Sequence, residues 1–131
     1  MMNSDVWIDT PSMGNEKIDS QHSQIAYLMK ELEAHLHDEL ESEKTFYLLL
    51  SSLMLTITQH FRDEEILLEE SGCPWLAEQV KDHTYFIEKL SGILAMEERG
   101  VPEQVVQFLK QWLQTHLHRL DLKCRSYLED H

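Results

Sequence analysis

The sequence contains little cysteine, glycine or proline, and this scarcity excludes several classes of protein. Of its 131 residues, two are Cys, four are Gly and three are Pro. Cys73 and Cys124 form no CxxC motif, and one pair is too few for a disulfide framework, so we expect both to be free thiols. With 42% hydrophobic and 27% charged residues, the composition is typical of a folded globular protein rather than a disordered or collagen-like one. The length predicts one domain spanning residues 1–131.

Positive charge is scarce as well. Eleven Lys and Arg residues oppose 24 Asp and Glu residues, which gives a formal net charge of −13 at pH 7. A chain this acidic repels the phosphates of nucleic acids and the headgroups of anionic lipids, so we expect neither as a partner.

Long apolar runs and a secretory signal are also missing. No apolar run approaches the roughly 20 residues that a helix needs to span a bilayer. The N-terminal residues MMNSDVWIDT contain neither a basic n-region nor an apolar h-region. We therefore expect no membrane-spanning segment and a cytoplasmic location.

Four segments show helical periodicity, with apolar residues recurring every three or four positions. They are predicted at about 19–38, at about 42–70, from Pro74 to before Gly100, and from Pro102 to beyond Cys124. Ser42 is a candidate N-cap, and proline is favoured in the first turn of a helix. The predicted apolar stripe of the third segment comprises Leu76, Gln79, Val80, His83, Ile87, Leu90 and Leu94. No segment shows the alternation of a β-strand.

Long helices joined by short loops pack as antiparallel neighbours. The predicted fold is therefore all-α, an antiparallel up-down-up-down four-helix bundle roughly 30 to 40 Å long. Residues 1–18, which include Trp7, Ile8 and Pro11, precede the first helix. We expect them to form an extended arm that packs its apolar side chains against the bundle.

Polar side chains interrupt the apolar stripes at one end of the predicted bundle. They are His22, His60, Glu64, Gln79, His83, His116 and Asp121. In an antiparallel bundle these positions lie at the same level and can meet in one layer. In the i, i+4 pairs His60/Glu64 and Gln79/His83, the two side chains lie on one helix face and point toward the same place. His116 and Asp121 are five residues apart, so they need a wider angle or a local π-bulge to do the same.

The polar groups of such a layer need partners, because a buried polar group without one costs several kcal/mol of folding free energy. One buried histidine alone is more often a hydrogen-bonded core residue than a ligand, and His60 with Glu64 alone would form an internal ion pair. However, no Lys or Arg shares these stripes, so convergence from four helices favours a metal. Imidazole with carboxylate suits iron, then zinc or manganese, and two carboxylates suit bridging of two ions. The histidines given no role are His35, His37, His118 and His131.

Four motifs carry a resemblance to a known family. They are GNEKIDSQH at 14–22, HFRDEE at 60–65, the segment 74–83, and WLQTHLHRLD at 112–121. In order, spacing and context they resemble those of the bacterial hemerythrins, over most of the chain. The resemblance implies a non-haem di-iron four-helix bundle that binds O2 reversibly and contains two oxo- or hydroxo-bridged Fe ions. It also implies that His22 and His60 ligate one iron, that His83 and His116 ligate the other, and that Glu64 and Asp121 bridge them.

The third helix departs from the family's HxxxH pattern, because Gln79 stands where a histidine is expected. Three hypotheses follow: the Gln79 carboxamide ligates iron, water takes the position, or that iron is lost. An open position would admit water or peroxide and favour oxidation of the centre. A smaller departure is Cys73 before Pro74, where an aromatic residue is more usual. Cys73 and Cys124 both belong to the metal end, and a redox pair is one hypothesis for them.

The leading functional hypothesis is an O2-binding protein for storage, delivery or sensing, and not an enzyme, with NO or peroxide as other small ligands. Trp112, one turn before His116, is the candidate for lining the ligand pocket. One alternative is a peroxidase or oxidase that uses the position opened by Gln79, although the chain lacks the Glu-x-x-His motif of ferritin-type oxidases. Another is a redox or O2 sensor that acts through a separate partner. We expect a monomer or weak homo-oligomer, in which Trp75 and Tyr47 make dimer contacts or pack locally.

Overall fold

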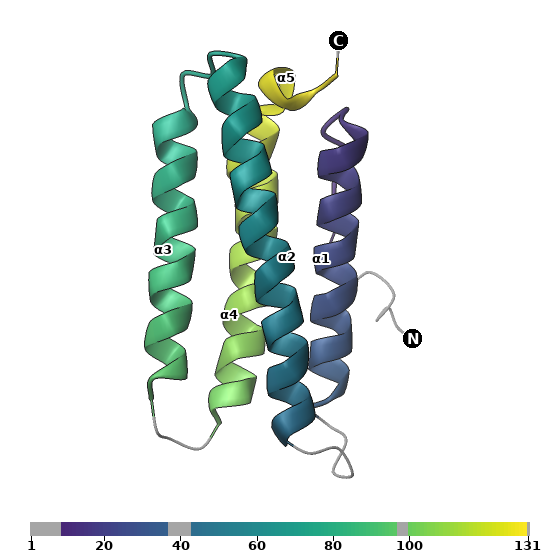
Figure 1. The fold of residues 1–131 in the computed structure, drawn as a ribbon, viewed down its shortest axis with the longest axis vertical. Coiled ribbons are helices and arrows are strands. Elements are labelled where there is room, and N and C mark those ends of the chain that lie inside the picture. Colours follow the sequence, from purple (N-terminus) through teal and green to yellow (C-terminus); the bar gives the residue numbers. More distant parts are fainter. Residues whose placement is uncertain (1–8, 37–42, 97–99, 131) are drawn as a thin grey trace.

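The computed structural model describes residues 9–36, 43–96 and 100–130. Its elements, in chain order, are α1 (Glu16–Ala34), α2 (Glu43–Glu70), α3 (Leu76–Leu94), α4 (Val101–Thr115), the π-helical segment η1 (His116–Asp121) and the short helix α5 (Arg125–Leu128). The four long helices run alternately down and up (Figure 1), and the described residues contain no strand. The predicted four-helix bundle is confirmed. No described helix is long and apolar enough to cross a membrane.

Helix α1 begins at Glu16, three residues before the predicted start, because Asn15 caps it. The Asn15 side-chain oxygen Oδ1 accepts a hydrogen bond from the Ile18 backbone N–H at 3.1 Å. Its amide nitrogen donates to the Leu128 carbonyl at 2.9 Å, so the same side chain joins the start of α1 to the end of the chain's last helix. The predicted helix end at Asp38 and the predicted Ser42 cap lie outside the described residues.

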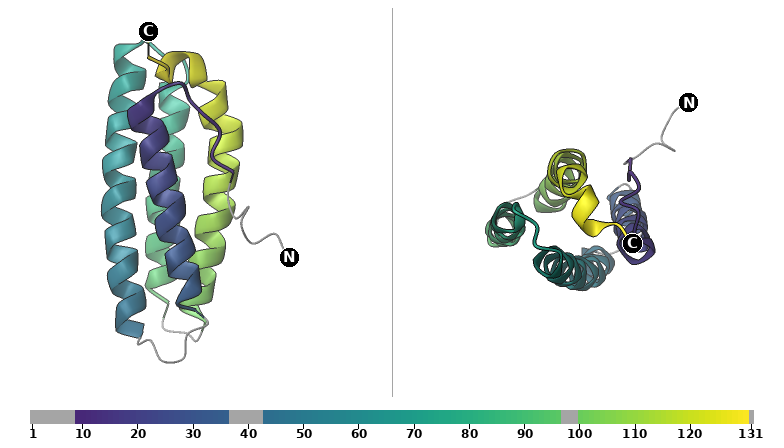
Figure 2. Two further views of the ribbon diagram at one scale, coloured as in Figure 1. Left: turned by 90° about the vertical axis from the view of Figure 1, so that its right-hand side faces the viewer. Right: turned by 90° about the horizontal axis from the view of Figure 1, so that it is seen from above.

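Residues 9–15 run as an extended segment beside α4 and η1 (Figure 2, left), as the predicted arm requires. The Met13 side chain is fully buried. Arg125 Nε donates to the Ser12 carbonyl at 2.9 Å, and His118 Nε2 lies 3.1 Å from the Asp9 carbonyl. These contacts fix the arm against the bundle near the polar layer. Trp7 and Ile8 lie outside the described residues.

Helix α2 ends in a Schellman motif centred on Gly72, whose φ of +70° is readily adopted only by glycine. The Gly72 N–H donates to the Glu69 carbonyl at 3.1 Å, and the Cys73 N–H donates to the Leu68 carbonyl at 2.9 Å. The turn continues through residues 73–75 before α3 begins at Leu76. The predicted start at Pro74 is therefore two residues too early.

The buried face of α3 differs from the predicted stripe. Its buried residues are Gln79, His83, Phe86, Leu90 and Ile93, a 4-3-4-3 spacing that faces the bundle. Val80 and Leu94 were predicted to be buried, but they are 40% and 39% exposed. Each follows a buried residue by one position, which turns its side chain by about 100° away from the core.

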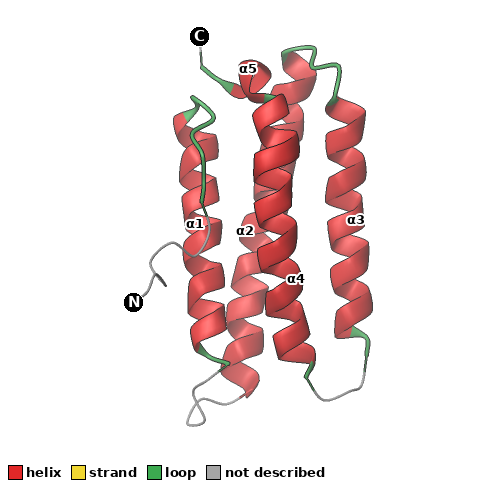
Figure 3. Cartoon of the chain, turned by 180° about the vertical axis from the view of Figure 1, so that it is seen from behind, coloured by secondary structure: helices red, strands yellow, loops and turns green. Residues whose placement is uncertain are grey.

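The polar layer separates two apolar clusters. The larger cluster fills the middle and far end of the bundle and includes Leu53, Phe86 and Leu109. The smaller cluster comprises Met13, Ile18, Leu68, Cys73, Cys124 and Leu128. Along each helical segment the polar residues fall between members of the two clusters. Seen from behind, α4 and α1 cover this interior with α2 beyond them (Figure 3). Tyr47 and Trp75 are half-buried and pack locally against the larger and smaller cluster, respectively.

Candidate metal centre

The structure brings together all seven polar residues predicted from the stripes. They are His22, His60, Glu64, Gln79, His83, His116 and Asp121, each no more than 3% exposed. They come from α1, α2, α3 and η1, so every long helical segment of the bundle contributes. Of the remaining described histidines, His35 contacts the carbonyl of Glu31 on its own helix and His118 contacts the arm.

The π-helical segment η1 places His116 and Asp121 on one face. In an α-helix, residues five apart point about 140° away from each other, whereas i to i+5 bonding brings them into line. His116 Nε2 consequently lies 3.0 Å from Asp121 Oδ1. Of the two alternatives that the five-residue spacing left open, a wider angle or a local π-bulge, the structure contains the π distortion.

Glu64 directs its two oxygens to opposite pairs of histidines. Its Oε2 lies 3.5 Å from His60 Nε2 and 3.9 Å from His22 Nε2. Its Oε1 lies 3.1 Å from His83 Nε2 and 3.7 Å from His116 Nε2. One carboxylate therefore faces both pairs, which is the geometry that bridging of two cations requires.

Asp121 repeats this arrangement from the other side of the layer. Its Oδ2 lies 3.4 Å from His22 Nε2, and its Oδ1 lies 3.0 Å from His116 Nε2. Two groups of ligand atoms result, and within each group the atoms lie within 4.8 Å of one another. The groups are His22, His60, Glu64 and Asp121, and Glu64, His83 and His116.

Three of the four histidines are oriented by an acceptor on a neighbouring helix. The pairs are His60 Nδ1 with Gln21 Oε1 at 2.7 Å, His83 Nδ1 with Glu65 Oε2 at 2.7 Å, and His116 Nδ1 with Asp82 Oδ2 at 2.6 Å. A hydrogen bond that keeps the proton on Nδ1 leaves the Nε2 lone pair directed at the centre. This is how histidines that bind metal ions are usually held.

Gln21, Glu65 and Asp82 were not predicted as site residues. Each directly adjoins a predicted residue in the sequence, but each contacts a histidine of a different helix. The motifs SQH, DEE and KDH contain them, and this adjacency was the only signal available.

The electrostatics of the layer favour ionised carboxylates. Burial by itself would raise the pKa of Glu64, but the charge of His60 and the close imidazoles of His116, His60 and His83 hold the pKa well below its ordinary value. Burial and the charge of Glu64 act to raise the pKa of Asp121. The opposing effects of His116 and His22 are larger, so the pKa of Asp121 is lowered. Burial opposes a charged His116, but the charge of Asp121 and bonds to three carboxylates hold its pKa well above normal. A hydrogen bond from His116 is the main cause of the lowered pKa of Asp82.

Gln79 enters the layer as a hydrogen-bond donor. Its Nε2 donates to Asp121 Oδ1 at 2.8 Å and to Cys124 Sγ at 3.6 Å. Its Oε1 is buried and makes no hydrogen bond with the described part of the chain. The carboxamide thus secures a carboxylate of the site on one side and contacts a thiol on the other. Burial raises the pKa of this thiol to about 12.

A narrow cavity adjoins the histidines of α1 and α2. Its volume is about 10 Å³, measured for the centre of a water-sized sphere. This is close to the minimum that a cavity needs to hold one water molecule. Its walls are mostly apolar and include Ile25, Met29 and Trp112. The Trp112 ring stacks on His116, with centroids 4.5 Å apart and planes 16° apart. Trp112 is part of the cavity wall, and its role in lining a ligand pocket stays a prediction.

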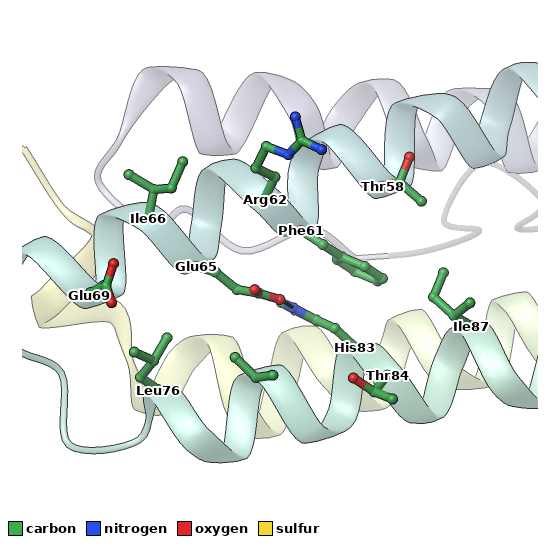
Figure 4. A pocket seen from close by; sticks show the side chains of 11 residues that line it. Thr58, Phe61, Arg62, Glu65, Ile66, Glu69, Leu76, His83, Thr84 and Ile87 are labelled. Atoms are coloured by element: carbon green, nitrogen blue, oxygen red, sulfur yellow. Dashed lines mark hydrogen bonds and ion pairs between the residues drawn. The ribbon is translucent and has the colours of Figure 1, made fainter.

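A wider groove between α2 and α3 lies over His83. It has a volume of about 480 Å³, and its lining includes Phe61, Arg62 and Ile66. Glu65 and His83 point toward each other across it (Figure 4), and the Glu65 side chain is 33% exposed. The groove thus brings solvent close to His83, whereas His22, His60 and His116 line the narrow cavity.

Comparison with known proteins places these features in a family context. The Hemerythrin HHE cation binding domain matches residues 13–123. A bacteriohemerythrin of Campylobacter jejuni subsp. jejuni is 25% identical over 122 residues, which cover 91% of each chain. A myohemerythrin of Theromyzon tessulatum is 29% identical over 122 residues, covering 93% of this chain and 92% of the relative. A bacteriohemerythrin of Pseudomonas aeruginosa is 28% identical over 120 residues, covering 88% and 76%. No solved structure gives a significant match.

Proposed function

The chain belongs to the Hemerythrin HHE cation binding domain family, and from this premise we propose that its buried polar layer holds two non-haem iron ions and binds O2. His22 and His60 would ligate one iron, His83 and His116 the other, and Glu64 and Asp121 would bridge them. The match over 13–123 also supports a single domain spanning residues 1–131. Iron supplies the reversible electron exchange with O2 that protein side chains lack.

The observation that carries the proposal is that each of the two carboxylates directs one oxygen to the His22 and His60 pair and the other oxygen to the His83 and His116 pair. Glu64 Oε2 and Asp121 Oδ2 are buried and make no hydrogen bond with the described residues. Two cations between the carboxylates and the inward Nε2 atoms would satisfy these oxygens. Imidazole and carboxylate donors suit iron. The residues present therefore fit the group that the family implies.

The protein's own contribution is to exclude water and restrict access. The cavity beside His22 and His60 is small and largely apolar, and Trp112 forms part of its wall. A site of this kind admits a diatomic molecule in preference to a larger or charged one. O2 is the proposed ligand, and NO is compatible with the same cavity.

The contacts of Gln79 leave its carboxamide oxygen, the atom through which an amide ligates a metal, without a hydrogen bond in the described part of the chain. Its nitrogen donates to Asp121 Oδ1. This oxygen or a water molecule would therefore complete the second ligand set. With water there, both irons would have two histidines and share two carboxylates, and the water position would be open to exchange.

The deciding experiment combines iron counting with absorption spectroscopy. Anaerobically reduced, iron-loaded protein is measured before air is admitted, after air is admitted, and after O2 is removed. We expect two irons per chain and an O2-dependent absorption band that disappears when O2 is removed. Less than one iron per chain under saturating supply would exclude the di-iron proposal. A band that never forms, or decays at once to a ferric spectrum, would exclude reversible O2 binding.

A second candidate function is peroxidase-type activity, favoured by the groove that approaches His83. An open position beside Gln79 would be reached from this groove by peroxide. Sustained peroxide consumption by the iron-loaded protein, lost in Gln79→His but retained in Gln24→His on the exposed side of α1, would support it. Equal activity of all three proteins would exclude a role for this position.

A further inference from the structure

Two buried thiols touch each other at the end of the bundle. Cys73 Sγ and Cys124 Sγ lie 3.8 Å apart although the residues are 51 positions apart in the sequence. They are the only two cysteines of the chain, and both are reduced in the structure. Burial of one cysteine needs no explanation beyond packing, since free cysteine behaves as a small apolar residue. Contact between the only two is a more specific arrangement.

Hydrogen bonds of the backbone hold each cysteine in place. Cys73 closes the Schellman motif through its N–H bond to the Leu68 carbonyl. The Cys124 N–H donates to the carbonyls of Leu120 and Asp121 at 3.1 and 3.0 Å. Both side chains then project into the smaller apolar cluster. The sulfur contact is therefore set by the ends of two elements and not by a loose segment.

The thiol pair is joined to the polar layer by one side chain. Gln79 Nε2 contacts Cys124 Sγ at 3.6 Å and Asp121 Oδ1 at 2.8 Å. A change in the position of the Cys124 sulfur would thus alter a contact of the residue that secures Asp121.

We propose that Cys73 and Cys124 form a reversible dithiol–disulfide pair that is oxidised by hydrogen peroxide. Disulfide formation shortens the sulfur separation from 3.8 Å to about 2.05 Å. The assignment goes beyond O2 binding and does not depend on iron in the polar layer. It gives the chain a second redox site, which consumes one peroxide molecule for each disulfide formed.

The reaction proceeds in two balanced steps. The Cys73 sulfur attacks peroxide, so that an S–O bond forms, the O–O bond breaks, and the products are a sulfenic acid and water. The Cys124 sulfur then attacks this sulfenic sulfur, the S–S bond forms, and the leaving oxygen departs as a second water with the Cys124 proton. Both sulfurs are oxidised by one electron each, and peroxide is reduced by two. Cys73 acts first because it is 7% exposed and Cys124 is fully buried.

The test treats the reduced, full-length protein with hydrogen peroxide, as purified and after chelator treatment. Free thiols are counted after unfolding, and intact mass and peptide mapping identify the product. In the chelator-treated sample we expect both thiols to disappear, the mass to fall by about 2 Da through loss of two hydrogens, and a 73–124 cross-link that a dithiol reductant reverses. Circular dichroism before and after treatment establishes that the folded protein reacted.

Two matched variants identify the order of the steps. Cys124→Ser should accumulate a sulfenic acid on Cys73 that a dimedone-type reagent traps, and Cys73→Ser should react at least tenfold more slowly. The proposal is overturned if the chelator-treated wild-type protein retains both thiols in excess peroxide. It is equally overturned if oxygen atoms add to the cysteines without a 73–124 cross-link, or if the cross-link forms only in unfolded protein.

Discussion

The orientation of the site histidines rests on acceptors that come from neighbouring helices. Gln21 of α1 contacts His60 of α2, Glu65 of α2 contacts His83 of α3, and Asp82 of α3 contacts His116 of η1. Each helix thus orients a histidine of the next one along the chain. Such contacts select the tautomer and direction of the imidazole, and loss of one usually weakens metal binding 10- to 100-fold, in order of magnitude.

Asp82→Asn should weaken iron binding through His116 without unfolding the bundle. The carboxamide is nearly isosteric but lacks the negative charge that holds the Nδ1 proton of His116. We expect the iron affinity to fall by about 10- to 100-fold, measured by competition with a chelator. Glu78→Gln, on the exposed side of the same helix, is the control and should bind iron like the wild type. Equal affinities of Asp82→Asn and the control would show that this contact does not position the ligand.

Gln79→His should restore a third histidine to the set that contains His83 and His116. Because Gln79 faces the polar layer and is fully buried, an imidazole at this position can reach the second iron. We expect iron loss to a chelator to slow by at least about tenfold, and the O2-dependent band to persist longer. The comparison with Gln24→His separates this effect from a general gain of surface histidine. Faster iron loss from Gln79→His would mean that the carboxamide is itself the better partner for this centre.

The residues of the polar layer could be found from the sequence, whereas their orienting partners could not. His22, Glu64 and Asp121 stand out because they occupy positions at which the helical period predicts apolar residues. Asp82 and Glu65 lie at the margin of the buried face, where an acidic residue is equally typical of a solvated helix surface. Only the packing of neighbouring helices distinguishes an acceptor for imidazole from an ordinary surface carboxylate.

At the level of the elements, the helices themselves were predicted correctly, and the differences between sequence and structure lie at the helix ends. The five-residue spacing of His116 and Asp121 indicated either a wider angle or a local π-bulge, and η1 contains the π distortion. The start of α1 was placed too late because the cap at Asn15 depends on contacts with Leu128, which are remote in the sequence. The start of α3 was placed too early because Pro74 lies in a separate turn, in which the Leu76 N–H donates to the Cys73 carbonyl at 3.3 Å. Caps that depend on tertiary contacts are not visible in local periodicity.

Gly72 and Gly92 provide a matched test of the turn that ends α2. Gly72 has φ of +70°, and an added Cβ would meet nothing within 4 Å, so Gly72→Ala strains only the backbone. We expect the free energy of unfolding to fall by about 1–2 kcal/mol. Gly92 lies within α3 and also has open space around it, so Gly92→Ala should raise the free energy of unfolding by about 0.5–1 kcal/mol. Urea denaturation of the metal-free proteins measures both changes. Effects of the same sign would contradict the assigned role of Gly72.

For the whole molecule, burial of the polar layer costs free energy of folding, and metal binding to this layer would stabilise the folded state. It lies between two apolar clusters and contains two ionised carboxylates with no lysine or arginine partner among their described contacts. A ligand that binds only the folded state stabilises it by about 4 kcal/mol when its concentration is 1,000 times its Kd. For a chain of 131 residues this corresponds to a rise in Tm of about 15 °C, since each kcal/mol shifts Tm by about 3–4 °C.

Removal of iron should therefore lower the Tm by about this amount, and restoration of iron should reverse the change. The measurement is thermal unfolding followed by circular dichroism, with and without a chelator, on the reduced protein so that the state of the thiols is constant. Glu64→Gln is the matched variant, because it retains the size of the side chain but removes the bridging charge. Its Tm should respond little to iron, and the Tm of the metal-free variant should lie below that of metal-free wild type, because the histidines that hold the pKa of Glu64 well below its ordinary value stabilise the ionised carboxylate. A wild-type Tm that does not change with iron would mean that folding and metal binding are not coupled through this layer.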